Sequence, residues 1–230
     1  PFRSRLEISA SATDLTMGLT VVNRGSEVAR FTGGLHTYLA VGEGFVRAQN
    51  DPAVATVLLT GAGEDFSSGM DLTASQQTSS GPPPFEFMMD AICGLEKPLV
   101  AAVRGCAIGY GMTVLFHCDV VYVGESVRMR MPFANLGLVT EAASCYMAPL
   151  VIGQKQAAEL LFTADWVDAA RAVEYGIATR SYPDDRVLDE ATAKARQMAQ
   201  WPTSSLVEMK RMLKSFHKEQ IRTARSLETA

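Results

Sequence analysis

The chain has 230 residues, of which 47% are hydrophobic and 20% are charged, as expected for one large globular domain or a domain with a small appendage. Its formal net charge of −4 gives no electrostatic basis for binding nucleic acid. No apolar run is long enough to span a bilayer, so we expect neither nucleic acid nor a membrane span.

The first part of the chain alternates predicted strands and helices. Residues 6–22 alternate apolar and polar side chains around a turn at 12–14, which predicts a hairpin. Residues 34–49 carry apolar side chains at roughly helical spacing. The apolar run 56–60, closed by glycine, is typical of a buried strand that enters a loop. Polar residues, glycine and three prolines make 73–84 a surface loop.

The alternation continues through the middle of the chain. We expect a helix near 85–95, a second buried strand at 99–103 and a third at 119–123. Between these strands, the glycine-punctuated segment 105–111 runs into a helical stretch that ends near Cys118. Strands that alternate with helices imply a mostly parallel sheet.

From about Ala142 onward the pattern is helical, and the apolar stripes are those of helices that pack on a core. The amphipathic segments are 154–162, 168–174, 189–201 and 203–218.

The cysteines and histidines indicate neither a disulfide framework nor a metal site. The cysteines lie among apolar or small residues without a CxxC pair, which favours thiols packed as small core residues in a reducing compartment. The histidines are scattered without metal-ligand spacing, so we expect no metal. These residues are Cys93, Cys106, Cys118, Cys145, His36, His117 and His217.

Two glycine loops, 64–72 and 105–112, each follow a predicted buried strand. Ligands bind at the carboxyl ends of strands in parallel α/β sheets. Neither loop matches GxGxxG or GxxxxGK[ST], so these two kinds of nucleotide phosphate cradle are not indicated. Backbone N–H groups from both loops, converging on one oxygen, would form an oxyanion hole. Taken singly, each loop is explained by a tight turn.

Glu141 is the only charged residue between Met131 and Gln154, in a run that looks built for burial. An isolated buried carboxylate is costly and is normally paired, protonated or used. Taken alone, Thr140 and Glu141 fit the start of a helix that runs through Tyr146, with Glu141 favoured in its first turn.

Several motifs resemble those of the crotonase (enoyl-CoA hydratase/isomerase) superfamily. Residues 66–72, FSSGMDL, are similar to the family motif F-[SC]-[AS]-G-x-D-[LI]. Residues 97–105, KPLVAAVRG, are similar to K-P-x-[IV]-A-A-[IV]-x-G, which precedes the family's second glycine loop. Further family-like positions are Cys118-Asp119, Ala172 with Gly176-Ile177-Ala178, and Trp201-Pro202 with Lys210. The resemblance covers about residues 53–214 and weakens before residue 50, where Asn23-Arg24-Gly25 lacks the proline of the family's N-R-P.

The resemblance implies an α/β fold, a crotonase (ClpP-like) spiral of ββα units with a C-terminal helical region. The spiral core with an acyl-CoA site would occupy 1–150, and the helical region, used in oligomerisation, 151–230. The implied partner is an acyl-CoA thioester substrate, and no cofactor is expected beyond the coenzyme A of the substrate. Homotrimers or dimers of trimers are common in this family. We expect an intracellular location, the mitochondrial matrix or peroxisome in a eukaryote and the cytoplasm in a bacterium.

The resemblance also implies site residues. The oxyanion hole would consist of the backbone N–H groups of Met70 and Tyr110, where many members carry glycine in place of this tyrosine. The Tyr110 side chain would line the acyl pocket. Expected substrate- and CoA-binding residues are Ser68, Gly69, Asp71, Leu72, Gly109, Phe133 and Arg30. Arg30 and Arg24 are candidates for phosphate contacts, although a solvated surface charge explains either one. The 73–84 loop would close over the acyl chain or be a disordered connection.

The acidic residues separate the reactions of this superfamily. Hydratases use two glutamates, and the corresponding positions, aligned from Gly111 and Pro132, are Thr113 and Phe133. Water addition by that route is therefore not expected. Residues 132–141, PFANLGLVTE, are similar to the P-F-x-x-L-G-x-x-x-E pattern of monofunctional Δ3,Δ2-enoyl-CoA isomerases, which implies that Glu141 moves a proton from C2 to C4. An apolar pocket would raise its pKa.

Two other functions remain open at this point. One is a catalytically silent acyl-CoA-binding or scaffold module on the same fold, which the tyrosine at position 110 and the weak N-terminal match leave open. The other is a different crotonase reaction, such as enoyl-CoA hydration, thioester hydrolysis or dehalogenation, that uses Glu141 differently.

Overall fold

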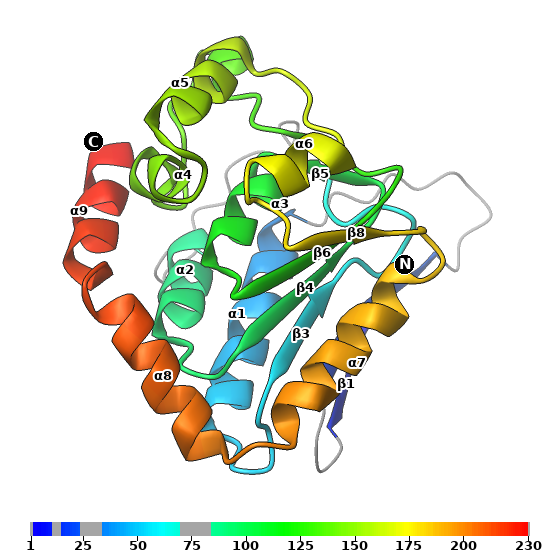
Figure 1. Cartoon of the computed structure of the whole chain (residues 1–230). Helices are drawn as coiled ribbons and strands as arrows, with labels where there is room; N and C mark the ends of the chain where they lie inside the picture. Colours follow the sequence, from blue (N-terminus) through cyan, green and yellow to red (C-terminus); the bar gives the residue numbers. More distant parts are fainter. Residues whose placement is uncertain (1, 11–14, 24–33, 70–83, 230) are drawn as a thin grey trace.

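A six-stranded sheet forms the centre of the molecule (Figure 1). The computed structural model describes residues 2–10, 15–23, 34–69 and 84–229, with side chains over 41–69 and 85–229. The strands, in spatial order, are β1 (Phe2–Ala10), β2 (Leu15–Asn23), β3 (Val57–Thr60), β4 (Leu99–Val103), β6 (Val120–Gly124) and β8 (Arg180–Tyr182). β1 and β2 pair antiparallel as the predicted hairpin, and every other neighbouring pair is parallel. The predicted, mostly parallel sheet is therefore confirmed.

A small second sheet divides the chain into repeating units. It pairs β5 (Cys106–Ile108) with β7 (Arg128–Arg130) in parallel. β4 and β5 lead into the helix α3 (Tyr110–Thr113), and β6 and β7 lead into the 3-10 helix η2 (Ala134–Leu136). This succession confirms the ββα repeat. β5, β7 and β8 were not predicted, because runs of three residues with mixed polarity carry too little periodicity.

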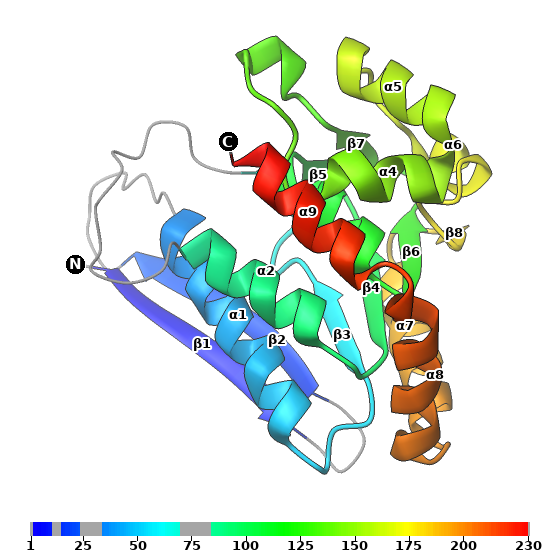
Figure 2. The same ribbon diagram turned by 90° about the vertical axis from the view of Figure 1, so that its left-hand side faces the viewer.

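Helices cover both faces of the main sheet. α1 (Gly34–Asn50) and α2 (Pro84–Gly94) lie on one face and α7 (Val187–Ala199) on the other (Figures 1 and 2). All five residues of β4 are buried because both faces are covered. Leu99, Ala101 and Val103 pack in the core with the α2 side, whereas Val100 and Ala102 pack with α7. Alternating side chains thus serve two cores.

The C-terminal third is mainly helical, as predicted, and it also supplies β8 and α7 to the sheet region. Its remaining helices are α4 (Ser144–Ile152), α5 (Gln154–Thr163), α6 (Ala169–Glu174), α8 (Thr203–Ser215) and α9 (Lys218–Glu228). The predicted helix over 203–218 ends three residues early, and after a bend the chain continues as α9, which lies against α4 (Figures 1 and 2).

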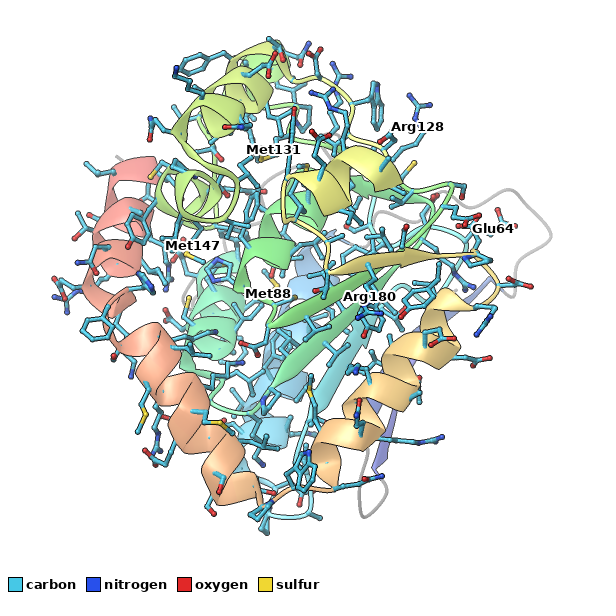
Figure 3. The ribbon with its side chains drawn as sticks, in the orientation of Figure 1. Glu64, Met88, Arg128, Met131, Met147 and Arg180 are labelled. Atoms are coloured by element: carbon cyan, nitrogen blue, oxygen red, sulfur yellow. The ribbon has the colours of Figure 1, made fainter. Side chains whose placement is uncertain are left out.

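Side chains follow the pattern expected from their polarity (Figure 3). Met88 and Met131 are at most 1% exposed, whereas Glu64 and Arg128 lie on the surface. The four cysteines, all within the described residues, are free thiols. Among the described helices, none has the length and apolar character that a membrane span requires.

Two lysines from the family-like motifs prove to be buried. Lys97 Nζ donates to the carbonyls of Ala48 and Asp51 at 2.6 and 2.5 Å, at the C-terminal end of α1. Lys210 Nζ on α8 donates to the Lys97 carbonyl at 2.7 Å and to Asp119 Oδ2 at 2.6 Å. Burial lowers the pKa of Lys210 to about 8. The two lysines thereby tie α1 and α8 to the start of β4.

Replacing Lys210 with methionine should destabilise the protein by about 3 kcal/mol, because it leaves the Asp119 carboxylate without its cation in a partly buried place. Urea unfolding at pH 7 measures the change. Lys155→Met, at an exposed position, is the matched control and should shift the free energy of unfolding by less than about 0.5 kcal/mol. Equal stability of the two variants would contradict a structural role for Lys210.

Candidate functional site

The two glycine loops lie side by side at the carboxyl ends of β3 and β4. The Ser67 N–H donates to the Cys106 carbonyl, and the Ile108 N–H donates back to the Ser67 carbonyl, both at 2.9 Å. Ser67 and Ala107 form an isolated parallel bridge. The first loop thereby extends the small sheet of β5 and β7, and the chain brings both loops to one place, as their positions after neighbouring strands predicted.

Glycine is required where the loops meet. A Cβ atom on Gly111 would lie 2.7 Å from Ser67 Cβ and 2.9 Å from the Ser67 carbonyl oxygen. Gly69 has φ +87°, and a Cβ there would lie 3.0 Å from the Ile108 carbonyl oxygen. Gly109 has φ +57°. These glycines permit a backbone approach and backbone angles that other residues rarely adopt.

Tyr110 is the first residue of α3, so its N–H points outward from the N-terminal end of that helix. Tyr110 is buried, and its ring packs edge-on against Phe85 of α2, with ring centroids 5.5 Å apart. Ser68 is exposed and Gly69 is half-buried. The predicted residues outside the described part of the chain are Met70, Asp71, Leu72, Arg24 and Arg30.

The positions used by hydratases carry no acid, and both are buried. Thr113 is 0% exposed, and its hydroxyl donates to the Tyr110 carbonyl at 3.4 Å. Phe133 is 7% exposed and belongs to the main core. Neither side chain takes up or gives a proton at neutral pH in the way that a carboxyl does.

The prediction that Thr140 and Glu141 begin a helix is wrong. Helix α4 starts at Ser144, and the two residues before it, Ala142 and Ala143, have φ values of +60° and +59°. This left-handed pair separates Glu141 from the helix. The Glu141 carbonyl instead accepts hydrogen bonds from the Ser144 N–H at 3.1 Å and the Ser144 hydroxyl at 2.5 Å.

The apolar run around Glu141 is not buried throughout, contrary to its appearance in the sequence. Leu136, Leu138 and Val139 are 46%, 50% and 70% exposed. Burial begins after Glu141, at Ala142 and Ala143. Glu141 therefore lies at the boundary between an exposed apolar loop and the core.

Two residues that the sequence did not single out hold this turn. Buried His117, at the end of η1 (Val114–His117), has Nε2 2.8 Å from the Ala142 carbonyl. Burial lowers the pKa of His117 to about 4, so the ring is neutral at pH 7, and Nε2 carries the proton because a carbonyl only accepts. Glu228 of α9 accepts hydrogen bonds from the N–H groups of Ala143 and Cys145, at 2.7 and 2.8 Å.

The environment of Glu141 favours its protonated form. Burial is the main cause and the nearby Glu228 carboxylate the second, and together they raise the pKa of Glu141 to about 7. Such a group is divided between acid and base near neutral pH, which suits reversible proton transfer. Among the described residues, no cluster of three or more His, Cys, Asp or Glu side chains is arranged to hold a metal.

Comparisons with known proteins agree on one family. Residues 35–230 match the family model described as Enoyl-CoA hydratase/isomerase. The chain is similar to 1,2-epoxyphenylacetyl-CoA isomerase of Escherichia coli (29% identity, covering 92% of this chain and 83% of that protein). It is also similar to Enoyl-CoA delta isomerase 2 of Rattus norvegicus (31% identity, covering 76% of this chain but 46% of that protein).

A solved structure extends the likeness to the fold. The crystal structure of an enoyl-CoA hydratase/isomerase from Pseudoalteromonas atlantica T6c superposes with a TM-score of 0.88. The two chains are 33% identical, and the match covers 97% of this chain and 88% of the other.

Proposed function

Because the chain belongs to the enoyl-CoA hydratase/isomerase family, we propose that it is a Δ3,Δ2-enoyl-CoA isomerase that uses Glu141 as its one proton carrier. One feature of the site favours isomerisation over hydration: it offers one suitable carboxyl group where hydration needs two. The half-buried Glu141 carboxyl has a pKa near 7, while Thr113 and Phe133 leave the two hydratase positions without an acid. One carboxyl is enough for an isomerisation, because its base and acid roles follow each other.

The proposed reaction moves one proton and one double bond. The Glu141 carboxylate removes a C2 proton from a 3-enoyl thioester, and the electron pair moves onto the thioester oxygen to give a dienolate. The N–H groups of Met70 and Tyr110 stabilise that oxyanion, each worth about 3 kcal/mol. The protonated Glu141 then returns the proton at C4, which gives the 2-enoyl thioester and regenerates the carboxylate.

The architecture around Glu141 supports this assignment. The N-terminal end of α3, which begins at Tyr110, lies where the two glycine loops meet, because Gly111 comes close to Ser67 there. Leu138 and Val139, which precede Glu141 in the sequence, have exposed apolar side chains that are suited to contact with an acyl chain. The substrate is accordingly an unsaturated fatty acyl-CoA.

An absorbance assay tests the proposal directly. Conversion of a 3-enoyl-CoA into the conjugated 2-enoyl thioester should increase absorbance, and chromatography of the products should show no 3-hydroxyacyl-CoA. Formation of the hydroxyacyl product from 2-enoyl-CoA would assign the protein to hydration instead. Tight binding of the thioester without any conversion would point to a silent acyl-CoA-binding module.

The pH dependence of kcat/KM should report Glu141 in the free enzyme. The carboxylate form removes the proton, so activity should rise with pH and level off above a pKa of about 7. A glutamate with an ordinary pKa near 4.5 would leave kcat/KM flat between pH 6 and 8. Initial rates over pH 5 to 9 at low substrate concentration distinguish the two profiles.

We also propose a homotrimer, or a dimer of trimers, as the assembly. The outward face of α8, continued by the residue directly after it, carries apolar residues at helical spacing that are more than half exposed. They are Met209, Met212, Leu213 and Phe216. Association with further copies of the chain would remove this stripe from water.

A further inference from the structure

The turn that carries Glu141 is held from two sides by residues distant in the sequence. We propose that Glu228, in the last turn of α9, is a positioning residue for Glu141, acting by fixing the left-handed turn at Ala142 and Ala143. The inference deepens the proposed function and rests on Glu141 as the proton carrier. In this role Glu228 acts through the turn and not directly on the substrate.

The turn needs an external hold because its residues do not favour its shape. Alanine prefers the right-handed helical region, and a helix that began at Glu141 would suit Ala142 and Ala143 better than their positive φ. A continuous helix through Glu141 would rotate and shift its carboxylate. The contacts that oppose this rearrangement therefore fix where the carboxylate lies.

Glu228 provides that hold through both of its carboxylate oxygens. Oε2 accepts from the Ala143 N–H, and Oε1 accepts from the Cys145 N–H. These donors belong to the residue before α4 and to its second residue, where N–H groups have no acceptor within the helix. His117 holds the opposite side of the same turn through the Ala142 carbonyl. The helix contact between α4 and α9 is visible in both views (Figures 1 and 2).

The groups around Glu228 act on its charge in opposite directions. Burial raises the pKa of Glu228, whereas the N–H groups of Cys145 and Ala143 and the Arg225 guanidinium on its own helix favour the charged form. Arg225 also pairs with Glu86 and Asp90 of α2. On α4, the neighbouring titratable group is the Cys145 thiol, whose pKa is raised to about 11, so it stays neutral. Glu141 is a further titratable neighbour, and a negative charge on Glu228 disfavours a second negative charge on it.

The test is Glu228→Gln, which keeps the shape, removes the charge and loses one of the two acceptors. We expect kcat for the 3-enoyl-CoA to fall roughly 10- to 100-fold with KM changed less than about threefold, as for a displaced catalytic group. The pKa of Glu141, read from carboxyl ¹³C NMR and assigned by its absence in Glu141→Gln, should fall. If Glu228 only stabilised the helix, Glu228→Gln would lower the melting temperature but leave the pKa of Glu141 unchanged.

Two further variants make the outcome decisive. Glu219→Gln makes the same charge change on the exposed side of α9, where Glu219 pairs with Arg222, and should alter neither kcat nor the Glu141 titration. Ala143→Gly removes the steric cost of the positive φ. In the Glu228→Gln background it should restore much of kcat but not the pKa of Glu141.

Wild-type kcat and an unchanged Glu141 titration in folded Glu228→Gln would overturn the proposal. If the single variant Glu228→Gln does not fold, Glu228→Gln is compared with unaltered Glu228 in proteins that both carry Ala143→Gly. The NMR titration needs no turnover, so it tests the influence of Glu228 even if the protein proves not to be an isomerase. Absence of isomerisation by the wild-type protein would count against the proposed function but not against the influence of Glu228 on the pKa of Glu141.

Discussion

Glu141→Gln is expected to lower kcat for isomerisation of a 3-enoyl-CoA by about 10⁴-fold, because glutamine has the shape of the carboxyl but neither takes nor gives a proton. Neither hydratase position offers an acid to replace it, since they carry Thr113 and Phe133. The dissociation constant for the thioester should change by less than about threefold. Stopped-flow absorbance and calorimetric titration with 3-enoyl-CoA and product measure the two quantities.

The same variant should be more stable than the wild type above pH 7. The pKa of Glu141 is about 7 in the folded protein against about 4.5 in the unfolded chain, so the folded state binds more protons over that interval. Stability of the wild type therefore falls as pH rises from about 4.5 to about 7, and the glutamine side chain of the variant, which does not titrate, avoids this loss. We expect Glu141→Gln to gain about 3 kcal/mol at pH 8 and nothing at pH 4.

Urea unfolding at both pH values separates this result from a general effect of substitution. Glu159→Gln, on α5, makes the same chemical change at an exposed position and should match the stability of the wild type both at pH 4 and at pH 8. Turnover near the wild-type rate in Glu141→Gln would end the case for this residue as the proton carrier. A gain in stability without loss of activity would leave it as a buried group with no part in the reaction.

The fold was largely predictable because its long elements have clear periodicity. The strand at 99–103 and the helix near 85–95 were placed within one residue of β4 and α2. The three-residue strands were missed, since they are defined by neighbours rather than by their own pattern. Lys210 was noticed only as family-like, because its contact with Asp119 joins residues 91 apart in the chain.

The sequence indicated a candidate proton carrier, but not how the turn around it is built. Glu141 stood out as a lone charge among apolar residues, but nothing in TEAASC indicates two alanines with positive φ. Alanine is the best helix former, so a helix was the natural prediction there. The sequence did not indicate that Glu228 holds this turn, because the turn is 85 residues away and Glu228 lies in a helix rich in charged residues.

Gly111→Ala should reduce kcat about 100-fold while Glu141 stays intact, because the added methyl group separates the two glycine loops. Its Cβ would lie 2.7 Å from Ser67 Cβ and 2.9 Å from the Ser67 carbonyl oxygen. The Ser67 carbonyl also accepts the hydrogen bond from Ile108, so a shift moves the first loop relative to Tyr110. A proposed oxyanion site with one donor from each loop loses its geometry.

Kinetics of the folded variant, with melting temperature as a parallel readout, measure this effect. Gly63→Ala is the matched control, since a Cβ there meets nothing within 4 Å, and its kcat should equal that of the wild type. Ser67→Gly removes two of the three atoms nearest to the new methyl group and should partly restore Gly111→Ala, a coupling that independent sites do not show. Full activity of Gly111→Ala would mean that the junction of the loops does not set the position of the reacting oxygen.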